Sequence, residues 1–290
     1  MMDKASTAMR PGSDNVRQHQ ATQGIAPMDR PGAFARFFMA VAEFAERLNL
    51  RYAKLGNPCV YDNADFAWAA GIESEWRLIR HELDRVLPRT DELPNVQEIT
   101  LDAASITKDA GWKIFLLVAY GIKSKPNIEL CPETWRIVQK IPGLKTAMFS
   151  VFQPGKRLPP HRGPYNGVLR LHLGLLVPEH DTNLGIRIGT EVRGWKEGSI
   201  LIFDDAYEHE AWNETEQPRV VLFVDFEKPL RFPVNIINHV LLRLAVLTPY
   251  LREGNDNLRR WERGFHSEKQ PSTTLALSTR RSVSHPRRSD

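Results

Sequence analysis

The stretch from residue 145 to residue 228 contains a series of short apolar runs in which buried and exposed positions alternate with a period of two. The runs are TAMFSVF, GVLRLHLGLLV, LGIRIG, SILIFDD and PRVVLFVDFE, and turn-forming segments with Gly or Pro separate them. Successive side chains of a strand lie on opposite faces, so several short strands at this spacing are typical of a β-sandwich or barrel. We therefore expect a β core over residues 145–228.

Apolar residues at helical spacing lie on both sides of this β region. They predict helices over residues 33–50, 72–87 and 131–143, so that residues 31–143 form a helical support. A C-terminal helix is expected over residues 232–252, where the sequence is apolar almost all round. We expect this helix to pack against the β core; the alternative is a segment over 232–251 that lies on the surface of a membrane. The fold class that follows is α+β.

Length and charge bound the domain organisation. The 290 residues, of which 42% are hydrophobic, suit one domain with a substantial core. Of the net charge of +4, residues 1–30 contribute +1 and residues 266–290 contribute +3, which leaves residues 31–265 neutral. We expect a disordered leader over 1–30, a single domain over 31–265 and a disordered basic tail over 266–290. A neutral domain without a concentrated basic face argues against nucleic acid as a partner.

The sequence shows no pattern typical of a targeting or membrane-spanning segment, and it has few cysteines. Residues 1–30 contain no apolar segment of a secretory signal, and no run of about 18 apolar residues follows that would span a membrane. Only Cys59 and Cys131 are present, which is too few for a disulfide scaffold. We expect a cytoplasmic location, with contact at the periphery of the inner membrane if residues 232–251 lie on a bilayer.

One of the expected strands carries charge where leucines prevail. In VLRLHLGLL, Arg170 and His172 fall on one face with Gly174, whereas the leucines fall on the other face. Two donors inside a small β barrel, beside a residue that leaves room, suit an anionic ligand. The alternative is that Arg170 pairs with an acid and that His172 is a hydrogen-bonded interior histidine.

Two further histidines flank this strand in the sequence. His161 follows Leu158-Pro159-Pro160, which is turn-forming, and His209 lies on a later strand. Two imidazoles are a minimal metal site, and non-haem Fe(II) oxygenases usually add a carboxylate two residues after the first histidine, where this chain has Gly163. Arg219 opens the next strand, and its guanidinium suits a carboxylate ligand. Acids that can be considered as a third ligand are Asp204, Asp205, Glu208 and Glu210.

With these residues in order, the chain resembles the aspartyl/asparaginyl β-hydroxylase family of Fe(II)- and 2-oxoglutarate-dependent dioxygenases. The resemblance covers about residues 72–228 and is strongest in SVFQPGKRLPPHRGPYNGVLRLHLGLLVP and GWKEGSILIFDDAYEHEAWNETEQPRVVLFVDFEKP. It implies a double-stranded β-helix core of the jelly-roll or cupin type. In this family glycine can replace the carboxylate ligand, and Gly163 matches that departure.

The resemblance also implies roles for single residues. His161 and His209 hold the metal, and they act with Arg170 as the catalytic residues. Ser150 and Arg219 bind the distal carboxylate of 2-oxoglutarate, while Arg170 and His172 reach its metal-chelating end. The chemistry implied is an oxidoreductase reaction with Fe(II), 2-oxoglutarate and O2, in which a C–H bond is hydroxylated and succinate and CO2 are released.

The substrate is expected to be the β-carbon of an Asp or Asn residue in a peptide or protein. The alternatives are the acyl chain of lipid A, which bacterial relatives in the family hydroxylate, and an amino acid or natural-product peptide. A different class of function is a non-catalytic, cupin-like protein that binds an anion.

Residues close in sequence to the histidines have less definite roles. Tyr165 and Asn166 line the mouth of the site or form a turn, and Trp212 lines the mouth or packs. Asp204 and Asp205 are expected in a turn or as groups that orient His209.

Overall fold

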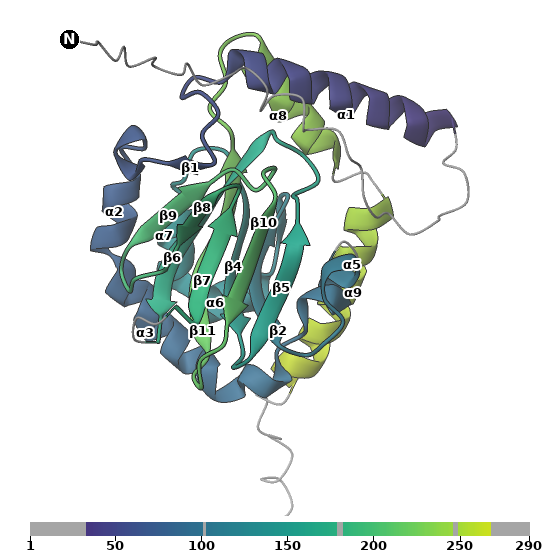
Figure 1. The fold of residues 1–290 in the computed structure, drawn as a ribbon. Coiled ribbons are helices and arrows are strands. Elements are labelled where there is room, and N and C mark those ends of the chain that lie inside the picture. The colour runs from purple at the N-terminus through teal and green to yellow at the C-terminus, as the bar shows by residue number, and fades with distance from the viewer. Residues whose placement is uncertain (1–32, 101–102, 179–181, 246–248, 268–290) are drawn as a thin grey trace, which may run out of the picture.

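Two antiparallel β-sheets face each other, and helices cover the outside of the larger one (Figure 1). The computed structural model describes residues 33–100, 103–178, 182–245 and 249–267. The expected α+β fold with a jelly-roll or cupin-like core is confirmed. The expected leader, residues 1–30, and all but the first two residues of the expected tail lie outside the described residues.

The larger sheet has seven strands in the order β1-β9-β6-β11-β4-β2-β3, and the smaller sheet has four in the order β5-β10-β7-β8. The strands of the larger sheet are β1 (Val60–Tyr61), β2 (Trp112–Ala119), β3 (Ile122–Lys123), β4 (Leu144–Phe152), β6 (Val168–Leu176), β9 (Ile200–Phe203) and β11 (Arg219–Glu227). Those of the smaller sheet are β5 (Lys156–His161), β7 (Leu184–Ile188), β8 (Glu191–Arg193) and β10 (His209–Asn213).

Both faces of the larger sheet are buried, which explains why its central strands are so apolar. Leu171 on β6 and Val224 on β11 lie in the core between this sheet and the helices. Phe223 on β11 belongs instead to the core between the two sheets. Arg170 and His172 share that inner face because side chains alternate along β6.

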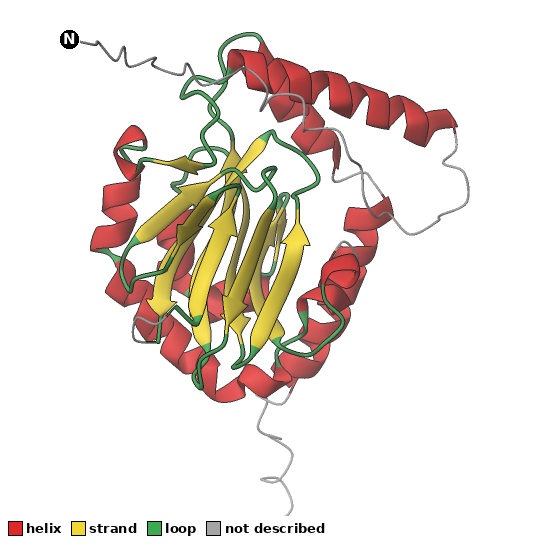
Figure 2. Cartoon of the chain, in the orientation of Figure 1, coloured by secondary structure: helices red, strands yellow, loops and turns green. Residues whose placement is uncertain are grey.

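The helices lie around the sandwich rather than inside it (Figure 2). Helices α3 and α7 pack together, α4 packs against α9, and α1 lies along α8 at one end of the sandwich (Figure 1). Their bounds are α1 (Ala33–Tyr52), α2 (Ala69–Ser74), α3 (Trp76–Val86), α4 (Val96–Ile99), α5 (Ala103–Ile106), α6 (Lys125–Leu130), α7 (Pro132–Val138), α8 (Val234–Ala245) and α9 (Pro249–Ser267), with 3-10 turns η2 (Asn63–Asp65) and η3 (Leu87–Glu92). No helix in the described ranges is long and apolar enough to cross a membrane.

The sequence-based boundaries differ from the structure in several places. The helix expected over 131–143 is α7, which already ends at Val138. The helix expected over 72–87 is two helices, because Glu75 between α2 and α3 has φ −98° and ψ 7°. The helix expected over 232–252 corresponds to α8 and the start of α9, which opens on Pro249, a position where proline loses no helical hydrogen bond. The β core also extends beyond 145–228, since β1, β2 and β3 complete the larger sheet.

The interpretation of Leu158-Pro159-Pro160 as a turn is wrong, because these residues lie in β5. Strand β5 is at the edge of the smaller sheet, where a proline removes no hydrogen bond from the sheet interior. This edge strand carries His161 as its last residue.

Candidate active site

His161 and His209 are neighbours across the smaller sheet. His161 ends β5, His209 begins β10, and the two residues are paired in the register of these antiparallel strands. Their ring centroids are 4.1 Å apart, and the ring planes are inclined by 53°. The sheet thus places two imidazoles where one ion can contact both.

Backbone carbonyls orient both imidazole rings. The Nδ1 atom of His161 lies 2.8 Å from the carbonyl oxygen of Pro159, and Nδ1 of His209 lies 2.9 Å from that of Tyr207. Because a carbonyl only accepts, each Nδ1 carries the proton and each Nε2 keeps its lone pair. Desolvation lowers the pKa of both rings, and for His209 repulsion from His161 adds to it. Both rings are therefore neutral at neutral pH, as a metal ligand must be.

Among the residues that the structure describes, no third protein ligand accompanies them. Within the described ranges no group of three or more His, Cys, Asp or Glu side chains is arranged to hold a metal. A Cβ atom on Gly163 would lie 2.3 Å from Oδ2 of Asp205, so the position two residues after His161 has no room for a side chain. Asp205 itself forms an ion pair with Arg170 at 2.8 Å. The pair of histidines is thus the metal-ligand set that these residues can offer.

Arg219 is a buried cation with no acidic partner among the described residues. Its side chain is 1% exposed, and neither Nε nor Nη1 has a hydrogen-bond partner in the described part of the chain. The guanidinium lies between two rings, 3.8 Å from the centroid of Phe152 and 4.3 Å from that of Trp195. Desolvation lowers its pKa to about 9, which still leaves it charged at neutral pH. A buried unpaired guanidinium calls for an anion.

Two more groups near Arg219 are ready to donate hydrogen bonds. His172 accepts a hydrogen bond at Nδ1 from Nε1 of Trp195 at 3.2 Å, so the neutral ring carries its proton on Nε2, which is buried without a partner. Desolvation keeps its pKa well below the usual value. Ser150 accepts from Nε1 of Trp112 at 3.0 Å, which leaves the hydroxyl proton free to donate.

Arg170 is already held by two acids. Its Nε lies 2.9 Å from Oδ1 of Asp225, and its Nη2 lies 2.8 Å from Oδ2 of Asp205. Burial raises the pKa of the Asp205 carboxyl, and Arg170 only partly offsets this. The alternative in which Arg170 pairs with an acid is therefore observed. Arg170 also lines the cavity, and its contact with a ligand stays a prediction.

All six sequence-predicted site residues line one cavity between the sheets. Of its thirteen lining residues, eleven are buried, and only His161 and Arg170 are half-buried, so the cavity opens beside these two. Arg219 and Ser150 lie in its closed part, since both are almost fully buried. The lining residues are Trp112, Ser150, Phe152, Leu158, His161, Arg170, His172, Ile186, Phe203, His209, Ala211, Arg219 and Phe223.

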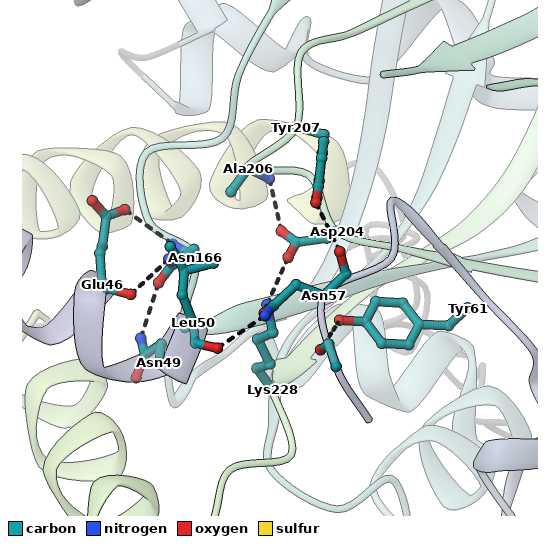
Figure 3. Close-up of polar contacts among 12 residues, drawn as sticks. Glu46, Asn49, Leu50, Asn57, Tyr61, Asn166, Asp204, Ala206, Tyr207 and Lys228 are labelled. Atoms are coloured by element: carbon teal, nitrogen blue, oxygen red, sulfur yellow. Dashed lines mark hydrogen bonds and ion pairs between the residues drawn. The ribbon is translucent and has the colours of Figure 1, made fainter. Parts of the chain in front are cut away.

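Some residues close to the histidines in sequence are not part of the cavity lining. Tyr165 hydrogen-bonds Asn49 and Asn238, so it joins the loop after β5 to α1 and α8. Asn166 is bonded to Asn49 and Glu46 of α1 (Figure 3). Trp212 donates to the carbonyl of Thr182 and packs over Gly185, which agrees with its packing role.

Two further residues contact the site residues but were not predicted from the sequence. Trp195 is not among the residues predicted for the site, yet it stacks on Arg219 and donates a hydrogen bond to His172. Asp225 had no assigned role, although it is opposite Arg170 in the β11–β6 pairing. A buried acid on the same face as Arg219, six residues along β11, was the one available signal.

A buried ion pair supports the turn that precedes His209. Nζ of Lys228 lies 2.8 Å from Oδ2 of Asp204, and the same amine contacts Asn57 at 3.0 Å (Figure 3). Asp204 also accepts from the backbone of Ala206 at 3.0 Å. This turn supplies the Tyr207 carbonyl that accepts from Nδ1 of His209. That Asp204 orients His209 stays a prediction, and it would do so through the position of this carbonyl.

A family model and the curated relatives that match this chain are hydroxylases. A family model described as Aspartyl/Asparaginyl beta-hydroxylase matches residues 73–229. An ornithine lipid ester-linked acyl 2-hydroxylase from Rhizobium tropici is 60% identical over 247 residues, which are 85% of this chain and 88% of that protein. The human aspartyl/asparaginyl beta-hydroxylase is 31% identical over 54% of this chain and 21% of its own length. A solved prolyl-4-hydroxylase from Pseudomonas putida covers 53% of this chain and 87% of its own, with a TM-score of 0.36 and 16% identity.

The prediction that the substrate is an Asp or Asn residue is wrong. The relative that matches 85% of the chain is, by its name, a lipid hydroxylase, at about twice the identity of the human Asp/Asn enzyme. The alternative of a lipid acyl chain is favoured instead, although the lipid named is ornithine lipid and not lipid A. The motifs that support the prediction are typical of the whole family, and relatives with differently named substrates match this chain, so these motifs do not identify the substrate.

Proposed function

We propose that this chain, which belongs to the aspartyl/asparaginyl β-hydroxylase family, uses Fe(II), 2-oxoglutarate and O2 to hydroxylate carbon 2 of the ester-linked acyl chain of ornithine lipid. The proposal of this substrate rests on the 60% identity, over 85% of the chain, to an ornithine lipid ester-linked acyl 2-hydroxylase. Because the family is one of hydroxylases, we set aside a non-catalytic anion-binding role.

The proposed ligands of Fe(II) are the Nε2 atoms of His161 and His209. Their support comes from the two Nδ1–carbonyl hydrogen bonds and from the lowered pKa of each ring. The remaining positions on the ion belong to the co-substrate and to small molecules, because Gly163 offers no side chain.

The proposed co-substrate site is the closed part of the cavity. Arg219 would bind the distal carboxylate of 2-oxoglutarate with Ser150, which gives the unpaired guanidinium a counter-ion. The Nε2–H of His172 would donate to an oxygen of the same anion. Arg170, whose orientation is held by Asp205 and Asp225, would face the metal-chelating end. The three unpartnered donor atoms, His172 Nε2 and Arg219 Nε and Nη1, are the structural support for an anionic ligand here.

When bound, iron and 2-oxoglutarate supply the oxidative chemistry, in which one atom of O2 enters the acyl C–H bond, the other enters succinate, and CO2 leaves. The chain binds, orients and excludes water. Phe203 beside His209 and Phe223 beside His172 give the cavity apolar walls, which keep bulk water out and suit an acyl chain. The opening beside His161 and Arg170 is where the acyl chain would enter.

The test is hydroxylation of purified ornithine lipid in detergent micelles with Fe(II), ascorbate and 2-oxoglutarate under air. We expect the lipid to gain one oxygen atom, and tandem mass spectrometry should locate that atom at carbon 2 of the ester-linked chain. Succinate should form in equal amount. Lipid A in the same micelles is the matched alternative substrate, and the Arg219→Met protein is the control for co-substrate dependence.

Hydroxylation of lipid A but not ornithine lipid would contradict the proposed substrate while keeping the reaction. Oxygen in the amide-linked chain, or at another carbon, would contradict the proposed position. Succinate formed without any modified lipid would show that the co-substrate site works and that the substrate is a different molecule.

A further inference from the structure

We infer that the outer faces of α1 and α8 form a docking surface for a lipid bilayer that carries anionic headgroups. The choice of a bilayer as the partner rests on the proposed function. Eight of the ten exposed large hydrophobic residues in the described part of the chain lie on α1, on α8 or directly before α8. We call this set the α1–α8 surface: Met39, Phe44, Leu50, Phe232, Ile236, Ile237, Val240 and Leu244.

The exposed stripe on α8 is apolar where a surface helix is normally polar. Val234, Asn238 and Leu242 recur every four residues and are buried. Ile236, Val240 and Leu244 recur with the same spacing on another side, and their exposed fractions are 52%, 47% and 46%. Residues at this spacing form one continuous strip along a helix, so α8 presents apolar side chains both inward and outward. Phe232, 75% exposed, extends the strip beyond the helix.

Exposed cations lie on, or within three residues of, the same two helices. Arg47, Arg51, Lys54, Arg231 and Arg243 are exposed, and no ion pair links any of them to the described residues. On the same two helices the acids are the exposed Glu43 and the half-buried Glu46. Apolar side chains rimmed by unpaired cations suit the headgroup region of an anionic bilayer, where the apolar groups enter the acyl boundary and the cations remain at the phosphates.

The surface is joined to the mouth of the active site. The loop that follows His161 lies between α1 and α8: Asn49 donates to the hydroxyl of Tyr165 at 3.0 Å, and that hydroxyl donates to Asn238 at 2.8 Å. Strand β5, which ends at His161, points toward the end of the sandwich where α1 and α8 lie (Figure 1). The cavity opens beside His161, so a bilayer on the α1–α8 surface would face the opening from which an acyl chain must enter.

A second copy of this chain is the competing occupant, and the charges argue against it. Self-association would bring the same five cations face to face, because a symmetric dimer uses one patch twice. Repulsion of that kind disfavours the contact, whereas anionic phosphates neutralise it.

The experiment is cosedimentation of the full chain with vesicles of phosphatidylcholine alone and with vesicles that also contain phosphatidylglycerol. The test variant carries Ile236→Ser, Val240→Ser and Leu244→Ser, and a second variant carries Arg243→Glu. The matched control is Val192→Ser on β8, an apolar residue of 58% exposure outside the α1–α8 surface. All replaced side chains are exposed in the free protein, so circular dichroism and the melting temperature should match those of the unmodified chain.

We expect binding to the phosphatidylglycerol vesicles that weakens as salt is added. The triple variant should bind at least ~10-fold more weakly, Arg243→Glu about five-fold more weakly, and Val192→Ser unchanged. No vesicle binding by the unmodified chain, equal binding by the triple variant, or a dimer in solution that the triple variant converts to a monomer would each overturn the proposal.

The outcomes also separate this inference from the proposed function. If vesicle binding is absent but ornithine lipid in micelles is hydroxylated, the docking surface is wrong and the proposed function stands. If the vesicles are bound as expected but no form of ornithine lipid is hydroxylated, the docking surface stands and the proposed substrate is wrong.

Discussion

His161 and His209 lie opposite each other in the β5–β10 pairing, with ring centroids 4.1 Å apart. A sheet register is more rigid than a loop, and each ring is further held by a carbonyl two residues earlier in the chain. The geometry of the proposed metal site is therefore set by the backbone of the smaller sheet, and the following predictions test the groups around it.

Either His161→Ala or His209→Ala should abolish Fe(II) binding, because a single imidazole leaves too few ligands. Anaerobic titration with Fe(II) and 2-oxoglutarate, followed by the visible absorption of the chelate, is the measurement. His239→Ala is the matched control, since His239 is a half-buried histidine that pairs with Glu227 outside the cavity. A variant that keeps its absorption band and its activity would remove that histidine from the site.

Arg219→Met should stabilise the protein without ligand and weaken 2-oxoglutarate binding. Methionine can still pack between Phe152 and Trp195, and it removes a buried charge that has no acidic partner in the described residues. We expect the free energy of unfolding to rise by about 1 to 3 kcal/mol and the Kd for 2-oxoglutarate to rise at least ~100-fold. Urea unfolding and calorimetric titration measure these two effects.

The matched control for this change is Arg157→Met, because Arg157 is exposed and pairs with Glu214. It should alter neither quantity by more than a few tenths of a kcal/mol. If Arg219→Met destabilised the protein and left the affinity for 2-oxoglutarate intact, Arg219 would be a packing residue.

Gly163→Ala should destabilise the protein by about 1 to 3 kcal/mol, because the new Cβ would overlap the Asp205 carboxylate. Gly163→Asp should be worse still and should not tighten Fe(II) binding, since its carboxylate would meet that of Asp205. Urea unfolding and the anaerobic Fe(II) titration check both. Gly194→Ala is the control, as a Cβ there meets nothing within 4 Å. Tighter iron binding by Gly163→Asp would mean that the site can accept a third protein ligand.

Asp204→Ala should lower the free energy of unfolding by about 3 to 5 kcal/mol, because it leaves Lys228 as a buried cation without its carboxylate partner. The double change Asp204→Ala with Lys228→Met should recover much of that loss, since no unpaired charge then remains. Thermal and urea unfolding of the four proteins measure the coupling. If the turn at Asp204 positions His209, Asp204→Ala should also lower the affinity for Fe(II). An unchanged affinity would mean that the ion pair of Asp204 and Lys228 contributes only to stability.

Stability should fall as the pH drops below the usual histidine range. Desolvation lowers the pKa of His172 and His209 well below 6.5, so the unfolded chain binds protons at a higher pH than the folded chain does. Their contribution is therefore present above the unfolded pKa and is lost as the pH falls below it. As the pH falls from about 7.5 to about 5.5, each of these two histidines should lower the free energy of unfolding by about 1.4 kcal/mol.

Urea unfolding of the metal-free protein across this pH range is the measurement. His172→Gln keeps an acceptor for Trp195 but cannot titrate, so its pH dependence should be shallower by about 1.4 kcal/mol over the same range. An unchanged slope would show that His172 keeps an ordinary pKa in the folded protein.

Local pattern was sufficient to predict most strands of the core. The alternation in VLRLHLGLL placed Arg170 and His172 on one face, and the structure puts both on the inner face of the larger sheet. The same local rules failed for β5, because Pro159 and Pro160 are compatible with a strand only when it is at a sheet edge. Edge position is a property of the whole sheet and has no local signal.

The sequence by itself determined which histidine, arginine and serine side chains the site can offer, their order and the strand face on which each falls. These depend only on residue identity and on the two-residue period of a strand. Only the tertiary structure decided that Trp195 lies over Arg219, that Asp205 fills the space beside Gly163, and that α8 leaves an apolar strip exposed beside α1. These relations join residues of different sheets, turns and helices. They depend on how the helices and sheets pack together, and the spacing of residues along the chain does not specify which residues of different elements come into contact.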